Sequence, residues 1–131
     1  MNCFEFSSSS KEKMEDLHPD MVKILNRALQ LSRYDFGVSE TLRAFERQKE
    51  MVASGRSMTL NSEHLAKDDG FSYAVDIYGY HDGRANYTDK VMNHISKCMY
   101  QAAFELCTAI EWGGLWTTLV DKPHYQLMPE W

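Results

Sequence analysis

The 131-residue chain lacks the features that mark several broad classes of protein. No uninterrupted apolar run is long enough to cross a membrane, so we expect no stable membrane insertion. Residues 1–7 show no basic region followed by an apolar stretch, so we expect no secretory signal peptide. The chain has no basic patch, no interleaved basic and aromatic residues and no Walker-type glycine loop. With a formal net charge of −5, these absences argue against binding to phosphate groups or nucleic acid.

Cysteine is also scarce. The three residues, Cys3, Cys98 and Cys107, are an odd number and show no Cys-x-x-Cys spacing. We therefore interpret them as reduced thiols of a protein made in the cytosol, and as poor candidates for metal ligands.

The length and the 44% hydrophobic content indicate one domain, residues 1–131, with one core. Helical spacing of apolar residues and the capping signals predict helices over residues 19–32, 44–54 and 88–108. Short alternating segments predict strands over residues 36–41, 73–78, 110–112 and 124–128, with a hairpin tip or lid at 79–87. Residues 7–10 are expected to be a polar, partly ordered lead-in. The predicted fold class is α+β, with helices packed around a small antiparallel sheet.

The most informative residues are two histidines and an aspartate. His64, Asp76 and His124 form the set of ligands that a catalytic zinc uses when its fourth position stays open. A single histidine is more often a surface or core residue, and we place His18, His81 and His94 in that class. The three candidates differ from these because they come in an ordered context: Ser-x-His, then Ala-x-Asp, then Asp-x-Pro-His-Tyr.

These ordered motifs resemble the zinc site of the D-Ala-D-Ala carboxypeptidase superfamily, and within it the L-alanyl-D-glutamate peptidases that serve as phage endolysins. The similarity extends to residues 28–36 before the first predicted strand, and to an Arg-x-x-x-x-Gln segment from Arg43 to Gln48. It also covers residues 112–116, Trp-Gly-Gly-Leu-Trp, which resemble the Trp-Gly-x-Asp-Trp segment of the family.

The resemblance implies roles for further residues around one catalytic zinc. Asp121, three residues before His124, matches the family's general base, and Arg43 matches its active-site arginine, which pairs with a substrate carboxylate or a developing oxyanion. Gln48 and Ser62 are weaker candidates for substrate binding. Trp112 and Trp116 either line the substrate cleft or belong to the core around a Gly-Gly turn.

The chain departs from the family pattern between its first two ligands. Family members have roughly His-x-x-Gly-x-Ala-x-Asp, whereas here eleven residues, 65–75, separate His64 from Asp76. We expect this longer loop to alter the cleft beside His64. Its segment 68–70, Asp-Asp-Gly, is interpreted as a solvated acidic turn rather than as a second cation site.

The function implied by the resemblance is a zinc metallopeptidase that hydrolyses the L-Ala–D-Glu bond in the stem peptide of bacterial peptidoglycan, as an endolysin for host lysis. Such a protein is expected to be a monomer, made in the host cytoplasm, that needs a holin to reach the wall in the periplasm. Three alternatives stay open: a D-Ala-D-Ala carboxypeptidase or dipeptidase with the same zinc site, a non-catalytic zinc domain that binds the wall or a protein partner, and a cytosolic α+β protein without a metal site. The intact Asp121 favours an enzyme over the second alternative.

Overall fold

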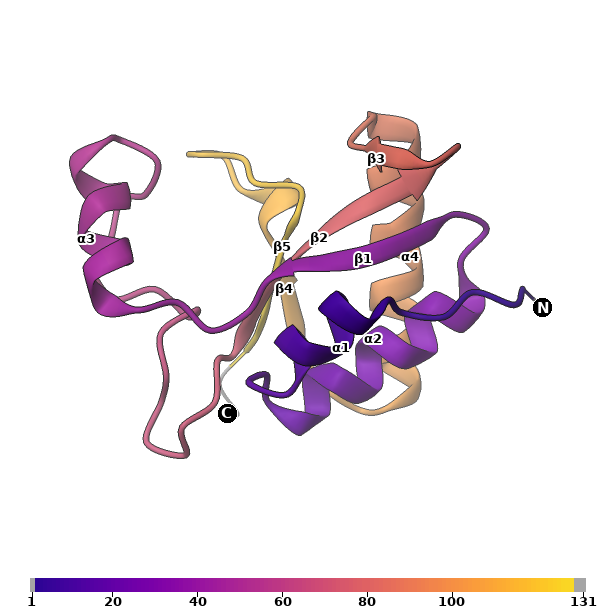
Figure 1. The fold of residues 1–131 in the computed structure, drawn as a ribbon, viewed down its shortest axis with the longest axis horizontal. Coiled ribbons are helices and arrows are strands. Elements are labelled where there is room, and N and C mark those ends of the chain that lie inside the picture. Colours follow the sequence, from indigo (N-terminus) through magenta and orange to yellow (C-terminus); the bar gives the residue numbers. More distant parts are fainter. Residues whose placement is uncertain (1, 129–131) are drawn as a thin grey trace.

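An antiparallel sheet of five strands lies at the centre of the structure, a computed structural model that describes residues 2–128 (Figure 1). Its strands are β1 (Asp35–Glu40), β2 (Ala74–His81), β3 (Arg84–Asn86), β4 (Ile110–Trp112) and β5 (His124–Leu127). The order across the sheet is β1-β2-β5-β4, and β3 pairs with the end of β2. Each pairing is antiparallel, so the predicted α+β class with a small antiparallel sheet is confirmed.

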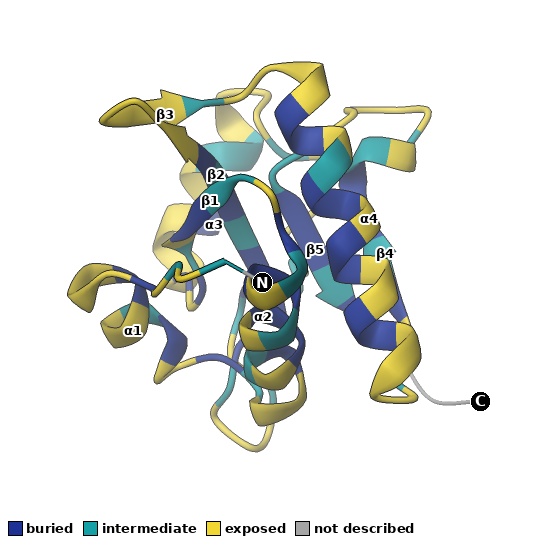
Figure 2. Ribbon diagram, turned by 90° about the vertical axis from the view of Figure 1, so that its right-hand side faces the viewer, coloured by how far each residue is buried: buried dark blue, intermediate teal, exposed yellow. Residues whose placement is uncertain are grey.

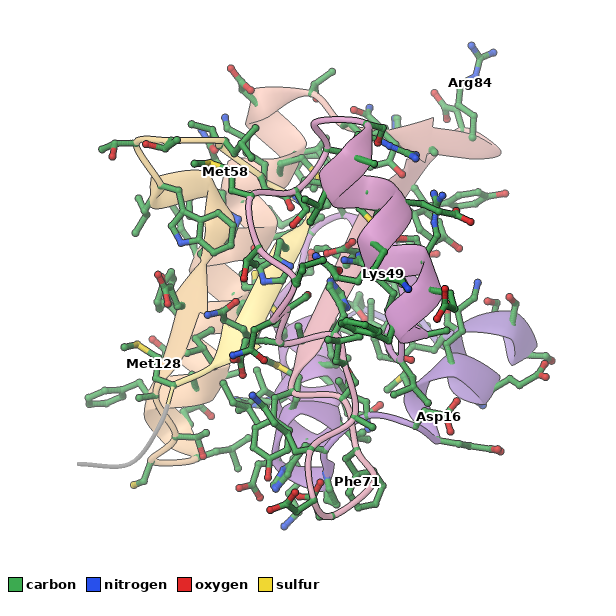
Figure 3. The ribbon with its side chains drawn as sticks, turned by 90° about the vertical axis from the view of Figure 1, so that its left-hand side faces the viewer. Asp16, Lys49, Met58, Phe71, Arg84 and Met128 are labelled. Carbon is green, nitrogen blue, oxygen red and sulfur yellow. The ribbon has the colours of Figure 1, made fainter. Side chains whose placement is uncertain are left out.

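The helices lie on both sides of this sheet. Helices α2 (Pro19–Leu31) and α4 (Asp89–Glu105) pack against each other and share one hydrophobic core with the strands. Helix α1 (Ser8–Met14) packs beside β1, whereas α3 (Phe45–Ala53) stands on the opposite side of the sheet from α4 (Figures 1 and 3). Within residues 2–128, no helix is both long and apolar enough to cross a membrane.

The two long helices form where the sequence predicts them, with small differences at their ends. Pro19 occupies the first turn of α2, and the Nδ1 atom of His18 accepts a hydrogen bond from the backbone of Asp20. Helix α4 alternates buried and exposed residues along its length (Figure 2). It ends at Glu105, three residues before the predicted end, because Cys107 adopts a left-handed backbone conformation with φ 54°.

Helix α1 replaces the partly ordered lead-in that we predicted. Ser7 caps the helix, because its hydroxyl accepts a hydrogen bond from the backbone of Ser10. Ser10 and Met14, one turn apart, are buried against the rest of the protein. The Ser10 hydroxyl also accepts a hydrogen bond from the backbone of Val38, which ties α1 to β1.

Alternation along the strands gives the sheet two chemically different faces. Val75 and Ile77 of β2 and Tyr125 of β5 are fully buried in the core shared with α2 and α4. Asp76 and His124, which lie next to them in sequence, therefore point to the other face. This second face carries the candidate site.

Candidate metal centre

Strand pairing brings two of the three predicted ligands together. Asp76 on β2 lies directly opposite His124 on β5, and His124 Nδ1 is 3.2 Å from Asp76 Oδ1. His64 reaches the same point from the loop before β2, with Nε2 3.2 Å from both Asp76 Oδ1 and His124 Nδ1. Three potential ligand atoms thus converge on one point, as the sequence predicted.

His64 is held in place although it lies on a loop. Its ring is buried, and its Nδ1 donates a hydrogen bond of 2.8 Å to the carbonyl oxygen of Thr41. The His64 backbone N–H donates to the Ser62 hydroxyl, and its carbonyl accepts from the backbone of Arg43. Because a carbonyl only accepts hydrogen bonds, Nδ1 carries the proton and the lone pair of Nε2 points at the centre.

His124 is oriented by a different partner with the same result. Its Nε2 lies 2.7 Å from the side-chain oxygen of Gln126, two residues further along β5 on the same face. Donation from Nε2 to this oxygen leaves the Nδ1 lone pair of His124 directed at the centre. Both imidazoles therefore show the outer-shell hydrogen bonds that are typical of histidines that bind a metal.

The arrangement fits a metal ion on chemical and geometric grounds. When the histidines are neutral, two imidazole lone pairs and a carboxylate oxygen face one another with no donor between them, which is an arrangement that favours a cation at their centre. At a metal–ligand distance of about 2.0–2.1 Å, tetrahedral geometry places ligand atoms about 3.3–3.4 Å apart. The observed 3.2 Å separations are close to that value. This buried His-Asp-His group could therefore hold a metal.

The same contacts shift the protonation of the two strand residues. In the absence of a metal, burial opposes ionisation of Asp76, but hydrogen bonds from the protonated forms of His124 and His64 outweigh it and hold the pKa of this carboxyl well below its usual range. Burial alone would lower the pKa of His124, yet the hydrogen bond and the charge of Asp76 raise it above the ordinary value. Without a metal, Asp76 thus favours the protonated form of His124.

Asp121, the predicted base, lies in the same cleft, and its backbone is fixed on both sides. Its N–H donates to the Gly113 carbonyl over 2.9 Å, and its own carbonyl accepts from the backbone of His124. A Cβ atom on Gly113 would overlap the main-chain oxygen of Asp121, so this close approach requires glycine. Burial and the nearby charge of Asp76 raise the pKa of the Asp121 carboxyl.

The cleft above these residues has a volume of about 660 Å³. Among the sequence-predicted residues, Arg43, Ser62 and Trp116 line it together with Asp121 and the three candidate ligands. Figure 3 views this side of the molecule, with α3 in front and the loop of Met58 at the top of the view. Further walls come from Met51, Arg56, Ser57, Met58, Thr59, Asn61, Glu63, Thr118, Leu119, Val120 and Gln126.

Comparison with known proteins identifies the family. The family model described as phage L-alanyl-D-glutamate peptidase matches residues 2–126. The chain belongs to this family. The resemblance seen in the sequence motifs is therefore confirmed, and the cleft is the candidate active site of a peptidase.

Two relatives extend this result. The L-alanyl-D-glutamate peptidase of Escherichia phage T5 is 27% identical over 122 residues, which cover 90% of this chain and 85% of that protein. The crystal structure of Serratia marcescens L-Ala D-Glu endopeptidase ChiX superposes with a TM-score of 0.85 at 38% identity, over 95% of this chain and 90% of that chain.

Arg43, the residue predicted to act as an active-site arginine, reaches the cleft in a buried position. Its Nη1 donates to the Gln48 side-chain oxygen over 2.7 Å, and its Nη2 pairs with Glu40 and lies 3.9 Å from Asp76 Oδ2. The side chain is only 5% exposed, and its Nε atom has no hydrogen-bond partner within residues 2–128. Arg43 therefore offers a fixed cation next to the metal centre.

Two candidates for substrate binding, Gln48 and Trp112, are not among the residues that line the cleft, and Trp112 takes the core position that was its alternative. Gln48 is fully buried and uses its amide to link Arg43 to Ser57 and the Thr59 carbonyl. Trp112 is buried, stacks on Tyr125, and donates its indole N–H to the carbonyl of Lys122 over 2.8 Å. Gln48 thus holds Arg43, Ser57 and Thr59, which line the cleft, and Trp112 holds the backbone next to Asp121.

The long loop between His64 and Asp76 was expected to alter the cleft, but it does not contribute to the cleft lining. None of residues 65–75 is among those that line the cleft. Instead Ser72 bonds through its backbone to Asp16 and His18, at the junction of α1 and α2. In Figure 3 the labelled Phe71 lies at the opposite end of the view from Met58. The insertion thus extends the molecule away from the cleft.

The remaining histidines stay outside the centre. His18 caps α2, His81 is exposed at the β2–β3 turn, and His94 accepts a hydrogen bond from the backbone of Arg33. Sequence reasoning missed Thr41 and Gln126, the acceptors that orient the two ligand histidines. Gln126 could have been found, because it follows His124 by two residues on a predicted strand and so shares its face.

Proposed function

We propose that this chain is a zinc-dependent endopeptidase that hydrolyses the L-Ala–D-Glu bond in the stem peptide of bacterial peptidoglycan. The observation that carries the proposal is the convergence of His64, Asp76 and His124. Hydrogen bonds fix both imidazoles so that their lone pairs point at the same place as the carboxylate oxygen. Two nitrogens and one oxygen suit zinc and leave a coordination position open. The names of the family and of the two relatives support the choice of bond.

The side chains around the centre have separate tasks in this proposal. A zinc ion at the site would supply a Lewis acid that polarises the scissile carbonyl and acidifies water. Asp121, whose pKa is raised by burial and by the charge of Asp76, takes the proton of the attacking water and passes it to the leaving amine. Arg43 pairs with the oxyanion or with a substrate carboxylate, because its guanidinium is fixed by Gln48 and Glu40 and faces the cleft.

The biological role that goes with this chemistry is that of a phage endolysin. We propose that the protein is made in the host cytoplasm, acts as a monomer, and reaches the wall in the periplasm after a holin permeabilises the inner membrane. Peptidoglycan is its proposed substrate and the holin its functional partner. This part of the proposal rests on the family and on the phage relative.

Product analysis tests the reaction directly. Purified protein with one equivalent of zinc is incubated with purified wall, and the released fragments are analysed by mass spectrometry after labelling of new amino groups. We expect new D-Glu amino ends and new L-Ala carboxyl ends. Release of free D-Ala with the L-Ala–D-Glu bond intact would assign the chain to the carboxypeptidases, and zinc binding without any cleavage would assign it to the non-catalytic wall-binding domains.

A further inference from the structure

Glu111 on β4 lies beside Gln126 of β5, and within residues 2–128 its carboxylate makes no hydrogen bond or ion pair with the three candidate ligands. Its Oε1 accepts a hydrogen bond of 2.8 Å from the indole N–H of Trp116, and its Oε2 accepts one of 3.2 Å from the side-chain N–H of Gln126. Glu111 and Gln126 are direct partners in the β4–β5 register, so the sheet itself fixes this pair.

The contact with Glu111 determines which way the Gln126 amide points. An ionised carboxylate only accepts hydrogen bonds, so it selects the NH₂ group of Gln126. The amide oxygen must then face His124 Nε2, which it does at 2.7 Å. With the amide reversed, an NH₂ group would face Nε2, and the proton of His124 would move to Nδ1, where it would point at His64 and Asp76.

The two ligand histidines differ in this respect. His64 donates to the backbone carbonyl of Thr41, an acceptor that cannot turn round. His124 donates to a side-chain amide, whose two ends have nearly the same shape and opposite hydrogen-bonding character. The orientation of His124 therefore needs a further residue to fix it, whereas that of His64 does not.

Trp116 is held by the same carboxylate. Its indole lies against His124, with ring centroids 5.1 Å apart, and it forms part of the cleft wall. Glu111 thus connects the orientation of a ligand to the position of a cleft-lining aromatic residue.

We propose that Glu111 is a positioning residue for the metal centre: by accepting from both Gln126 and Trp116, it holds His124 in the tautomer that presents Nδ1 to the metal. This inference rests on the proposed zinc site at His64, Asp76 and His124. It adds an outer layer of three residues, Glu111, Gln126 and Trp116, that act on the metal only through His124.

The test uses the Glu111→Gln variant and the charge-conserving exchange Glu111→Gln with Gln126→Glu. In the single variant, the new amide at position 111 has one acceptor oxygen for two donors. The indole N–H of Trp116 takes that oxygen, the NH₂ group at position 111 then faces Gln126, and the Gln126 amide reverses. In the exchange variant every donor regains an acceptor. The carboxylate at position 126 accepts from His124 and from the amide at position 111, while the oxygen of that amide accepts from Trp116.

Two measurements follow each variant: zinc affinity by competition with a chelating dye, and the imidazole tautomers of the metal-free protein by ¹⁵N NMR at a pH above the raised pKa of His124, where this imidazole is neutral. We expect Glu111→Gln to weaken zinc binding about tenfold and to move the His124 proton to Nδ1, with His64 unchanged. The exchange variant should restore the Nε2–H tautomer and bring the affinity within about threefold of wild type. Glu105→Gln is the matched control, because Glu105 also accepts from two side chains, Arg27 and Gln101, but at the far end of α4.

A Glu111→Gln protein with wild-type zinc affinity and the Nε2–H tautomer at His124 would overturn the inference. If the single variant does not fold, the exchange variant decides alone, since a folded exchange protein that binds zinc about ten times more weakly would also overturn it. Failure of the wild-type protein to bind zinc would instead contradict the proposed function, and the tautomer of His124 in the metal-free variants would still report whether Glu111 orients it.

Discussion

The two faces of the sheet are made from alternating residues of the same strands, yet they have opposite properties. On the face covered by α2 and α4, Val75, Ile77 and Tyr125 are fully buried and pack into one apolar core. On the other face, Asp76 and His124 are adjacent polar groups that lie beneath an open cleft. A shift of one residue in register would exchange the two sets, so the core packing that fixes the register also aligns the ligands.

The faces differ in how their groups contribute to stability. Apolar burial on the helix-covered face stabilises the fold without a specific partner. On the cleft face, Asp121 is partly buried and has a raised pKa, and Arg43 keeps a buried Nε atom without a hydrogen-bond partner in the described residues. Such features cost stability in the resting protein and are typical of functional sites.

Replacement of Asp76 by Ala removes a ligand from the cleft face without touching the apolar face, and it has the largest expected effect. The loss of one ligand should abolish stoichiometric zinc binding, and activity should fall by about a thousandfold or more, because a metal supplies several kcal/mol of transition-state stabilisation. The far-UV circular dichroism should stay native, since Asp76 is not part of the apolar core. Elemental analysis that finds a full zinc complement in Asp76→Ala would contradict the assignment.

Asp121→Asn separates catalysis from stability on the same face. An amide cannot relay a proton, so turnover should fall by about two orders of magnitude or more while zinc is retained. Because the pKa of Asp121 is raised in the folded state, its ionised form is disfavoured there. The neutral amide should therefore raise the thermal midpoint of the metal-free protein at about pH 7. Near-wild-type turnover with zinc bound would remove Asp121 from the reaction.

How far the sequence predicts this arrangement depends on the range of each interaction. The start of α2 and the first part of β2 follow from local signals, Pro19 at the helix start and the alternation from Ala74 to Tyr78, whereas β2 continues to His81, three residues beyond its predicted end. Helix α1 was missed because apolar residues are sparse in it, although Phe6, Ser10 and Met14 recur at four-residue spacing and are buried. The order of the strands depends on pairings between distant segments, which no local pattern encodes.

The candidate site also divides into residues that local motifs predict and residues that depend on contacts between distant segments. The three ligands and Asp121 were predicted from motifs, and the structure brings them into one cleft. Thr41, Gln126 and Glu111 contribute through hydrogen bonds that exist only once β1, β4 and β5 are in register. Gln48 and Trp112 share the motifs of cleft residues, but their burial behind the cleft depends on packing that the sequence does not specify.

Ile77→Val tests the helix-covered face next to Asp76. Ile77 is fully buried, and removal of one methylene group should lower the free energy of unfolding by about 0.5–1.5 kcal/mol. Zinc affinity and kcat/KM should stay unchanged, because the side chain points away from the ligands. Chemical denaturation and a zinc titration on the same preparation check both statements. A loss of zinc affinity without a loss of stability would show that the faces are not independent.

The smallest expected effect is a pH dependence of the metal-free protein. The pKa of His124 is raised above its ordinary 6.5, so its contribution to stability is complete below about pH 6.5 and is lost as the pH rises through the raised value. The pKa of Asp76 is lowered from 3.8, so its contribution is present above that pH and is lost on acidification.

Thermal melting in the Asp121→Asn background, which removes that carboxyl's own titration, should show stability declining above about pH 6.5. Zinc binding should strengthen over the same range, because it requires neutral imidazole. Stability that rises with pH in the metal-free protein would show that Asp76 and His124 do not pair as the structure places them.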